Sequence, residues 1–231
     1  MAIIVEDQFT EASAVALTAH TPSPTGTSWT EEDHQNTAVI NDNATNDYIV
    51  ASATQTAAGQ VCSAQPNPSV AEYDIEWQCK VADTGTATRQ QRLIARWVDV
   101  NNHYGFRVLP DGHASNAYRL YKVVSGTLTE LATVDGTTAV DDVFVFEIRD
   151  ATKRVLKNGS EILTTSDNEL TGAGKAGVGM GRYTLVETTG NMNVGAMAWD
   201  NFKVTEVSAA VDHVTYPAAV AVPAFPYHME V

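Results

Sequence analysis

Basic residues are few in this chain and absent from both of its ends. The 231 residues contain 14 Lys and Arg against 28 Asp and Glu, a formal net charge of −14. No Lys or Arg precedes Lys80 or follows Lys203. A surplus of negative charge repels nucleic-acid phosphates and anionic lipid headgroups. The composition therefore predicts a protein that binds neither nucleic acid nor membranes.

Cysteines and long apolar runs are also scarce. Only Cys62 and Cys79 occur, too few for a disulfide framework or a zinc site, so we expect free thiols. No run of residues is long and apolar enough to cross a bilayer. The first nine residues lack the basic and apolar regions of a secretory signal. These absences predict a chain that is made and folded in a cytoplasm.

Helical patterns are rare, whereas strand patterns recur along the chain. Residues 10–20 are the best helical candidate, and a loop or a single helical turn explains them equally well. Alternating or β-prone runs occupy residues 46–54, 69–83, 92–100, 103–110, 117–124, 127–134, 142–150, 153–167, 174–183 and 197–207. Asn158–Gly159 predicts a tight hairpin within one of them. The predicted fold is all-β, an antiparallel β-sandwich or jelly roll.

The order of these segments resembles the concanavalin A-like lectin/glucanase jelly roll, in its laminin-G-like branch. The similar pieces are residues 7–9, 95–112, 118–134, 155–167, 170–181 and 199–206. The resemblance implies one β-sandwich over residues 1–207 whose two ends meet, with Phe9 and Phe202 both buried. Residues 17–30 also resemble the opening of such domains in bacteriophage structural proteins. Domains of this fold bind glycans, hydrolyse them or serve as structural subunits, so the fold alone does not decide the function.

An acidic run, EYDIEW at residues 72–77, raises the possibility of hydrolysis. It places Glu72, Asp74 and Glu76 at alternating positions of a predicted strand. Retaining endo-β-glucanases carry a similar run, and by this resemblance Glu72 is the nucleophile and Glu76 the acid/base. Retaining catalysis needs carboxyl groups about 5–5.5 Å apart, whereas alternate residues of a strand lie about 6–7 Å apart. The alternation continues for two further polar residues, as on an ordinary polar strand face, so we expect no enzymatic activity.

Three aromatic residues near predicted loops are candidates for glycan binding. Trp29, Tyr104 and Tyr183 could present rings with polar neighbours, the arrangement that sugar-binding surfaces use. Packing of the same rings in the core is the alternative. Residues 41–47, NDNATND, could form a calcium loop or an ordinary Asn/Asp turn. The histidines lack zinc-ligand spacing, and we predict no metal and no cofactor.

The last segment, residues 208–231, differs from the rest of the chain. It contains three prolines and little charge, and prolines confine it to extended or edge conformations. We expect an assembly arm that docks on a neighbouring subunit, with apolar contacts from Val214, Tyr216, Val220, Val222, Phe225 and Tyr227. A tail folded back on its own sandwich is the alternative.

These observations together predict a non-enzymatic structural or interaction protein of a virus particle. A capsid decoration, head-fibre or tail-associated protein of a bacteriophage, made in the host cytoplasm, fits the lack of a secretory signal, the neutral Thr/Ala-rich composition, the apolar arm and the likeness of residues 17–30. Its expected partners are further copies of itself, other virion proteins and a host surface glycan. The alternatives are a carbohydrate-binding module and a retaining β-glucanase that uses Glu72, Asp74 and Glu76.

Overall fold

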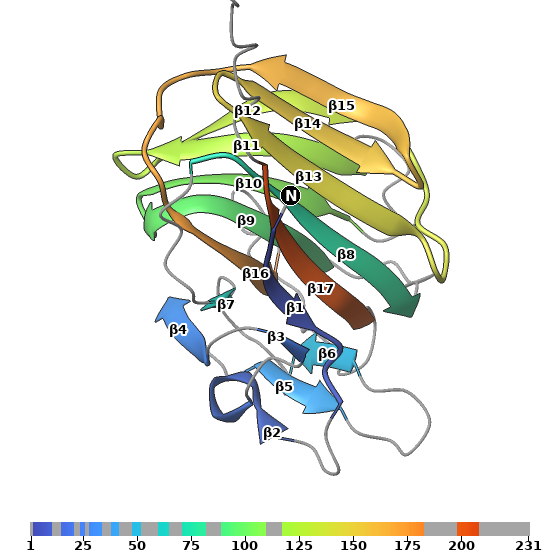
Figure 1. The fold of residues 1–231 in the computed structure, drawn as a ribbon. Helices are drawn as coiled ribbons and strands as arrows, with labels where there is room; N and C mark the ends of the chain where they lie inside the picture. The colour runs from blue at the N-terminus through green and yellow to red at the C-terminus, as the bar shows by residue number, and fades with distance from the viewer. Residues whose placement is uncertain are drawn as a thin grey trace, which may run out of the picture.

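Two antiparallel sheets packed face to face form the molecule (Figure 1). The computed structural model describes residues 2–10, 15–20, 24–25, 28–33, 38–41, 48–51, 60–64, 71–81, 89–109, 117–182 and 198–207. We call the ten-stranded sheet sheet A and the seven-stranded sheet sheet B. The predicted all-β antiparallel sandwich is therefore confirmed.

Sheet A runs in the order β15-β14-β13-β8-β17-β6-β5-β2, with β1 paired to β17 and β3. Its strands are β1 (Ile3–Asp7), β2 (Val15–Ala16), β3 (Pro24–Thr25), β5 (Ala38–Asn41), β6 (Tyr48–Ala51), β8 (Tyr73–Val81), β13 (Val143–Arg149), β14 (Thr152–Lys157), β15 (Ser160–Ser166) and β17 (Ala198–Glu206).

Sheet B runs in the order β12-β11-β10-β9-β16-β7-β4. Its strands are β4 (Trp29–Asp33), β7 (Gln60–Ala64), β9 (Arg89–Asp99), β10 (Asn102–Val108), β11 (Tyr118–Val124), β12 (Thr127–Val134) and β16 (Lys175–Arg182). Among the described residues, the only helical segment is the 3-10 helix η1 (Leu17–Ala19). Residues 15–20 thus follow the helical-turn interpretation of the sequence, because Val15 and Ala16 pair with β5 instead of starting a helix.

Alternation along each strand explains the two-layer architecture. In β8, Tyr73, Ile75 and Trp77 are buried between the sheets, while the intervening side chains are partly exposed. Phe144 and Phe146 of β13 pack in the same layer, and Phe106 of sheet B contacts both rings. One apolar face per strand leaves the other face free for polar groups.

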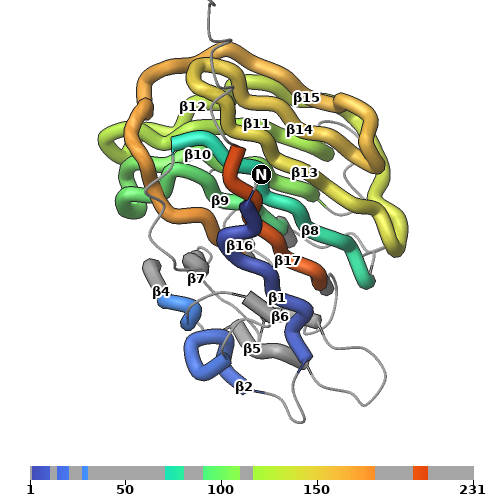
Figure 2. Tube along the Cα trace, in the orientation of Figure 1, coloured from blue at the N-terminus to red at the C-terminus, as the bar shows by residue number. Residues whose placement is uncertain are grey.

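The first strand and the last described strand are neighbours in sheet A. Strand β1 pairs antiparallel with β17, with Ile3 opposite Thr205 and Asp7 opposite Phe202, and Figures 1 and 2 show the two strands side by side. Phe9 and Phe202 are both fully buried. The prediction that the two segments meet is confirmed, and this pairing creates the surface described next.

Candidate functional site: a polar groove on sheet A

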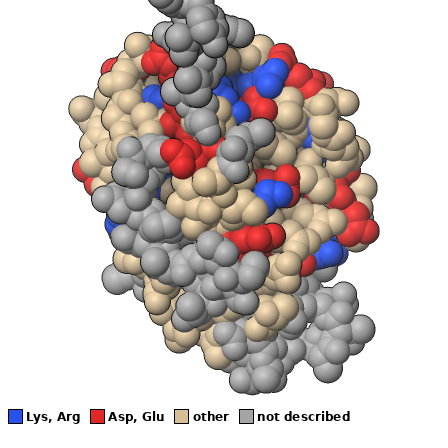
Figure 3. Space-filling model, in the orientation of Figure 1, with Lys and Arg blue, Asp and Glu red and all other residues tan. Residues whose placement is uncertain are grey.

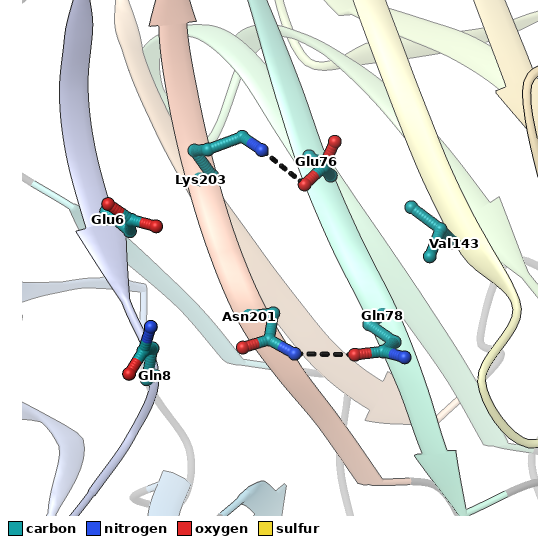
Figure 4. Close-up of a pocket in the computed structure, with 7 residues that line it drawn as sticks. All are labelled: Glu6, Gln8, Glu76, Gln78, Val143, Asn201 and Lys203. Carbon is teal, nitrogen blue, oxygen red and sulfur yellow. Dashed lines mark hydrogen bonds and ion pairs between the residues drawn. The ribbon is translucent and has the colours of Figure 1, made fainter.

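A groove on the outer face of sheet A is the candidate site. It has a volume of about 210 Å³ and spans strands β1, β17, β8 and the start of β13 (Figure 4). We call this pocket the sheet A groove. Its lining residues are Glu6, Gln8, Glu76, Gln78, Val143, Asn201 and Lys203. Acidic and basic side chains also lie interspersed over the face of the molecule seen in Figure 3.

Strand register places these side chains in rows. Glu6 lies opposite Lys203, and Lys203 lies opposite Glu76, so the strand position of the lysine lies between those of the two glutamates. Each of these residues alternates with a buried neighbour in its own strand, which directs the polar side chains outward. Gln78 lies opposite Val143 at the far side of the groove.

An irregularity in β17 shapes the floor of the groove. The register between β17 and β8 shifts between Asp200 and Lys203, and Asn201 within the shift has a φ of +54°. Asparagine tolerates this left-handed conformation better than most residues. Bulges of this kind redirect side chains and occur often near binding sites. Here the Asn201 side chain donates from Nδ2 to Oε1 of Gln78.

The interactions within the groove are unevenly distributed. Lys203 forms an ion pair with Glu76, and Gln78 both accepts from Asn201 and donates to Asp141 at 3.1 Å. The side chains of Glu6 and Gln8, by contrast, make no hydrogen bond or ion pair with any other described residue. The β1 side of the groove therefore offers a carboxylate and an amide that are open to a ligand.

The acidic run of β8 is divided among separate partners. Glu72 accepts a hydrogen bond from the Asp150 main-chain N–H at 2.9 Å. Asp74 forms an ion pair with Arg149 at 2.6 Å, although burial still raises the pKa of the Asp74 carboxyl against the effect of that guanidinium. Of the three carboxylates, only Glu76 lines the groove. This arrangement fits the interpretation of the run as a polar strand face.

Two of the three aromatic candidates for glycan binding, Trp29 and Tyr104, are buried. Trp29 is 2% exposed, because its indole N–H donates to the buried carboxylate of Asp7 at 2.7 Å. The same carboxylate bonds Nε2 of His20 at 2.8 Å and accepts from the Phe9 main-chain N–H at 2.9 Å. Asp7 thus fixes Trp29 in the core, and this ring forms no exposed platform.

Tyr104 is fully buried as well. Its hydroxyl donates to Asp167 and accepts from the Leu170 N–H at 3.2 Å, and burial, with a further contribution from Asp167, raises its pKa to about 12. The Lys153 ammonium lies 4.7 Å from the centre of its ring. Tyr104 is therefore a core residue, whereas Tyr183 lies outside the described residues.

Several other expectations concern residues that the structure does not describe. These are the arm at residues 208–231 and all of the 41–47 loop beyond Asn41, so both stay predictions. Within the described ranges, no group of three or more His, Cys, Asp or Glu side chains is arranged to hold a metal ion. No helix in that part of the chain is long and apolar enough to span a membrane. Cys79 is buried and forms no disulfide with another described residue.

The sequence did contain a signal for the groove. The resemblance implies that residues 2–9 and 199–207 lie close together, and alternation about the buried Phe202 points Asn201 and Lys203 outward. What the sequence lacked was the register that brings Glu6 opposite Lys203. Without it, the outward side chains of three distant strands could not be assigned to one surface.

The fold is similar to those of solved carbohydrate-binding domains. The carbohydrate-binding module CBM66 of Bacillus subtilis superposes with a TM-score of 0.52 at 12% identity, over 74% of this chain and 94% of that module. Domain 4 of AbnA, a GH43 extracellular arabinanase from Geobacillus stearothermophilus solved with arabinotriose, gives a TM-score of 0.52 at 12% identity, over 87% and 91% of the chains. A Bacillus subtilis protein of unknown function with a galectin-like fold gives a TM-score of 0.50 at 10% identity, over 88% and 96%.

The sequence itself matches no protein-family model and no curated protein. At identities of 10–12%, these likenesses concern the fold. The chain thus has a lectin-like β-sandwich of the kind found in galectin-like and carbohydrate-binding domains, as the resemblance noted in the sequence implied.

Proposed function

We propose that this chain is a non-catalytic carbohydrate-binding domain and that the sheet A groove is its glycan site. The proposal rests on the lining of the groove. Carboxylate, amide and ammonium groups from three neighbouring strands all border the same solvent-exposed pocket. Sugar hydroxyls both donate and accept hydrogen bonds, so a mixed set of polar groups suits them. The similarity of the fold to carbohydrate-binding domains supports the same function.

The contacts of the carboxylates favour binding over hydrolysis. A retaining glycosidase needs two carboxyl groups that flank one bond. In this chain Glu72 and Asp74 are bound to Asp150 and Arg149, and neither lines the groove. Glu76 is paired with Lys203, so the one carboxylate of the acidic run that lines the groove has no second carboxylate of that run beside it.

A glycan array followed by calorimetric titration tests the proposal. Wild-type protein should bind a subset of glycans, and Asn201→Gly should weaken that binding about tenfold, the loss expected for one or two hydrogen bonds. Glycine suits the positive φ at this position. The matched control is Ser125→Gly, which makes the same kind of change at an exposed turn residue with a φ of +49°.

The control variant should bind as the wild type does. Equal losses in the two variants would mean that the groove is not the site. An array without any bound glycan at high protein concentration would overturn the proposed function itself.

We also propose that the domain acts on a virus particle, where glycan binding would serve attachment to a host surface. The support is the likeness of residues 17–30 to the opening of phage structural domains, together with the apolar, Pro-containing segment 208–231. An apolar segment of this kind gains free energy when a neighbouring subunit covers it. Deletion of residues 208–231 should give a folded domain that no longer assembles or co-purifies with particles. Normal assembly of the shortened chain, or its unfolding, would contradict the arm.

A further inference from the structure

We propose that the sheet A groove selects glycans that carry a free amine, such as oligomers of glucosamine, over neutral or acidic glycans of the same length. This inference rests on the proposed function, because it names the ligand class of the same site. It depends on the charges of the groove, on the direction of its donors and on the groups left open to a ligand.

The first step is the charge of the groove. Glu6 and Glu76 are two carboxylates, and Lys203 is the one basic residue of the lining, so one negative charge remains uncompensated. Lys203 is paired with Glu76 and not with Glu6, although Glu6 lies directly opposite it on β1. The uncompensated charge therefore lies on the β1 side, at Glu6.

The second step is the direction of the donors. Figure 4 shows the Lys203 side chain extending toward Glu76 on β8, away from Glu6. The Asn201 amide nitrogen likewise points to Gln78, which leaves its carbonyl oxygen on the side of β1. The Lys203 ammonium and the Asn201 amide nitrogen thus interact with the β8 wall. On the β1 side, the Glu6 carboxylate and the Asn201 carbonyl oxygen remain as acceptors beside the Gln8 amide, which can donate or accept. A ligand that binds at Glu6 has to supply the hydrogen-bond donors.

The third step is the chemistry of such a ligand. A protonated sugar amine brings three N–H donors and a positive charge, and charge-assisted hydrogen bonds to a carboxylate are stronger than neutral ones. A uronate or sulfate would face Glu6 and the chain's net charge of −14, so it should be repelled. Because the groove is open to solvent, we expect a preference of about threefold to tenfold at low salt that shrinks as salt screens the pair.

The experiment uses three β-1,4-linked tetrasaccharides that differ only at carbon 2: the glucosamine, N-acetylglucosamine and glucose oligomers. Calorimetric titrations of the full chain are run at about 20 mM and about 500 mM salt, where the screening lengths differ several-fold. The glucosamine oligomer should bind about threefold to tenfold more tightly than the other two at low salt. The three affinities should converge at high salt.

Two matched variants locate the effect. Glu6→Gln keeps a polar side chain and removes the charge, so the affinity for the glucosamine oligomer should fall to that for the two neutral oligomers. Glu161→Gln removes the same charge from an exposed position on β15, outside the groove, and should retain the preference.

Each of the remaining outcomes contradicts the preference for amines, and each points to a different reason. Equal binding of the three oligomers overturns it and leaves the proposed function standing. Equal losses in the two variants would assign the preference to the net charge of the whole protein. No binding of any of the three overturns the inference too, and the glycan array then decides separately whether the domain binds carbohydrate.

Discussion

The hydroxyl of Tyr73 joins the two sheets through hydrogen bonds in both directions. It accepts from the main-chain N–H of Arg96 at 2.6 Å and donates to the carbonyl oxygen of Gly174 at 3.1 Å. Tyr73 belongs to β8 of sheet A, whereas Arg96 lies in β9 of sheet B. Arg96 has a φ of +47°, and main-chain irregularities of this kind persist when the surroundings satisfy their polar groups.

Tyr73→Phe should therefore destabilise the domain. The substitution keeps the ring but removes the hydroxyl that binds the Arg96 N–H and the Gly174 carbonyl. Because these two groups would lack a hydrogen-bond partner, we expect the free energy of unfolding to fall by about 1–3 kcal/mol. Urea unfolding measures it. The control is Tyr121→Phe, because the buried Tyr121 hydroxyl has no partner among the described residues. A loss in the control as large as that in Tyr73→Phe would contradict the specific role of the Tyr73 hydroxyl.

Gly174→Ala should be more harmful than its small size suggests. A Cβ atom at this position would lie 2.4 Å from the main-chain carbon of Arg96, and the backbone of β9 would have to move. We expect a loss of about 2–3 kcal/mol, at the upper end for overpacking. Gly172→Ala is the matched control, since no heavy atom lies within 4 Å of its added Cβ. Equal denaturation midpoints for the two variants would show that the main chain of β9 can move to accommodate the added methyl group without a loss of stability.

The buried Lys153 side chain should make stability rise with pH in the alkaline range. Burial, with a further contribution from the Arg96 charge, lowers its pKa from 10.5 to about 8, while its ammonium donates to the carbonyl oxygens of Asp150 and Asp167. Above pH 8 the folded state loses this proton before the unfolded state does. The free energy of unfolding should therefore increase between about pH 8 and pH 10, by about 1 kcal/mol.

Unfolding in urea at pH 7.5 and pH 9.5 measures this increase. Lys153→Met should remove it, whereas Lys80→Met, which changes a partly exposed lysine, should keep it. A fall in stability over the same interval for the wild type would be the opposite of the expected sign.

His103 should remain neutral under mildly acidic conditions. Its ring packs at a tilt against Trp97 with 4.8 Å between centres and meets Tyr121 edge-on at 5.9 Å. Burial lowers its pKa from 6.5 to about 4, despite the opposing effect of the Asp99 carbonyl. Between these two values the unfolded state binds more protons, so His103 contributes stability that is lost as pH falls from about 6.5 toward 4.

Nuclear magnetic resonance can follow this ring directly. The His103 imidazole signals of the folded protein should show no titration between pH 7.5 and pH 5, whereas the urea-unfolded chain should titrate near pH 6.5. A midpoint near 6.5 in the folded state would show that water reaches the ring.

The sequence predicted the long strands well, because apolar and polar residues alternate along them as their side chains alternate between the buried and the exposed face of the sheet. Residues 69–83 and 153–167 contain β8 and the β14–β15 hairpin, and the Asn158–Gly159 turn lies where expected. The sequence did not predict the short strands β4 and β7, because the alternation of apolar and polar residues is hard to detect in runs of only five residues.

The site was harder to predict than the fold for a physical reason. Glu6, Glu76 and Lys203 lie far apart in the sequence, and only strand order and register bring them together. The sequence left open whether Trp29 lies in the core or at the surface, because nothing in its own neighbourhood shows that Asp7 accepts its N–H. Long-range hydrogen bonds of this kind are not encoded in local patterns.

The pairing of β1 with β17 has a consequence for synthesis in the cell. The first strand leaves the ribosome roughly 200 residues before the strand that completes its side of the sheet. At about 5–20 residues per second, it waits on the order of 10–40 seconds with an open edge. During that interval an unpaired strand can template pairing with another chain. The acidic residues Glu6 and Asp7 would oppose such contacts, since like charges on neighbouring nascent chains repel.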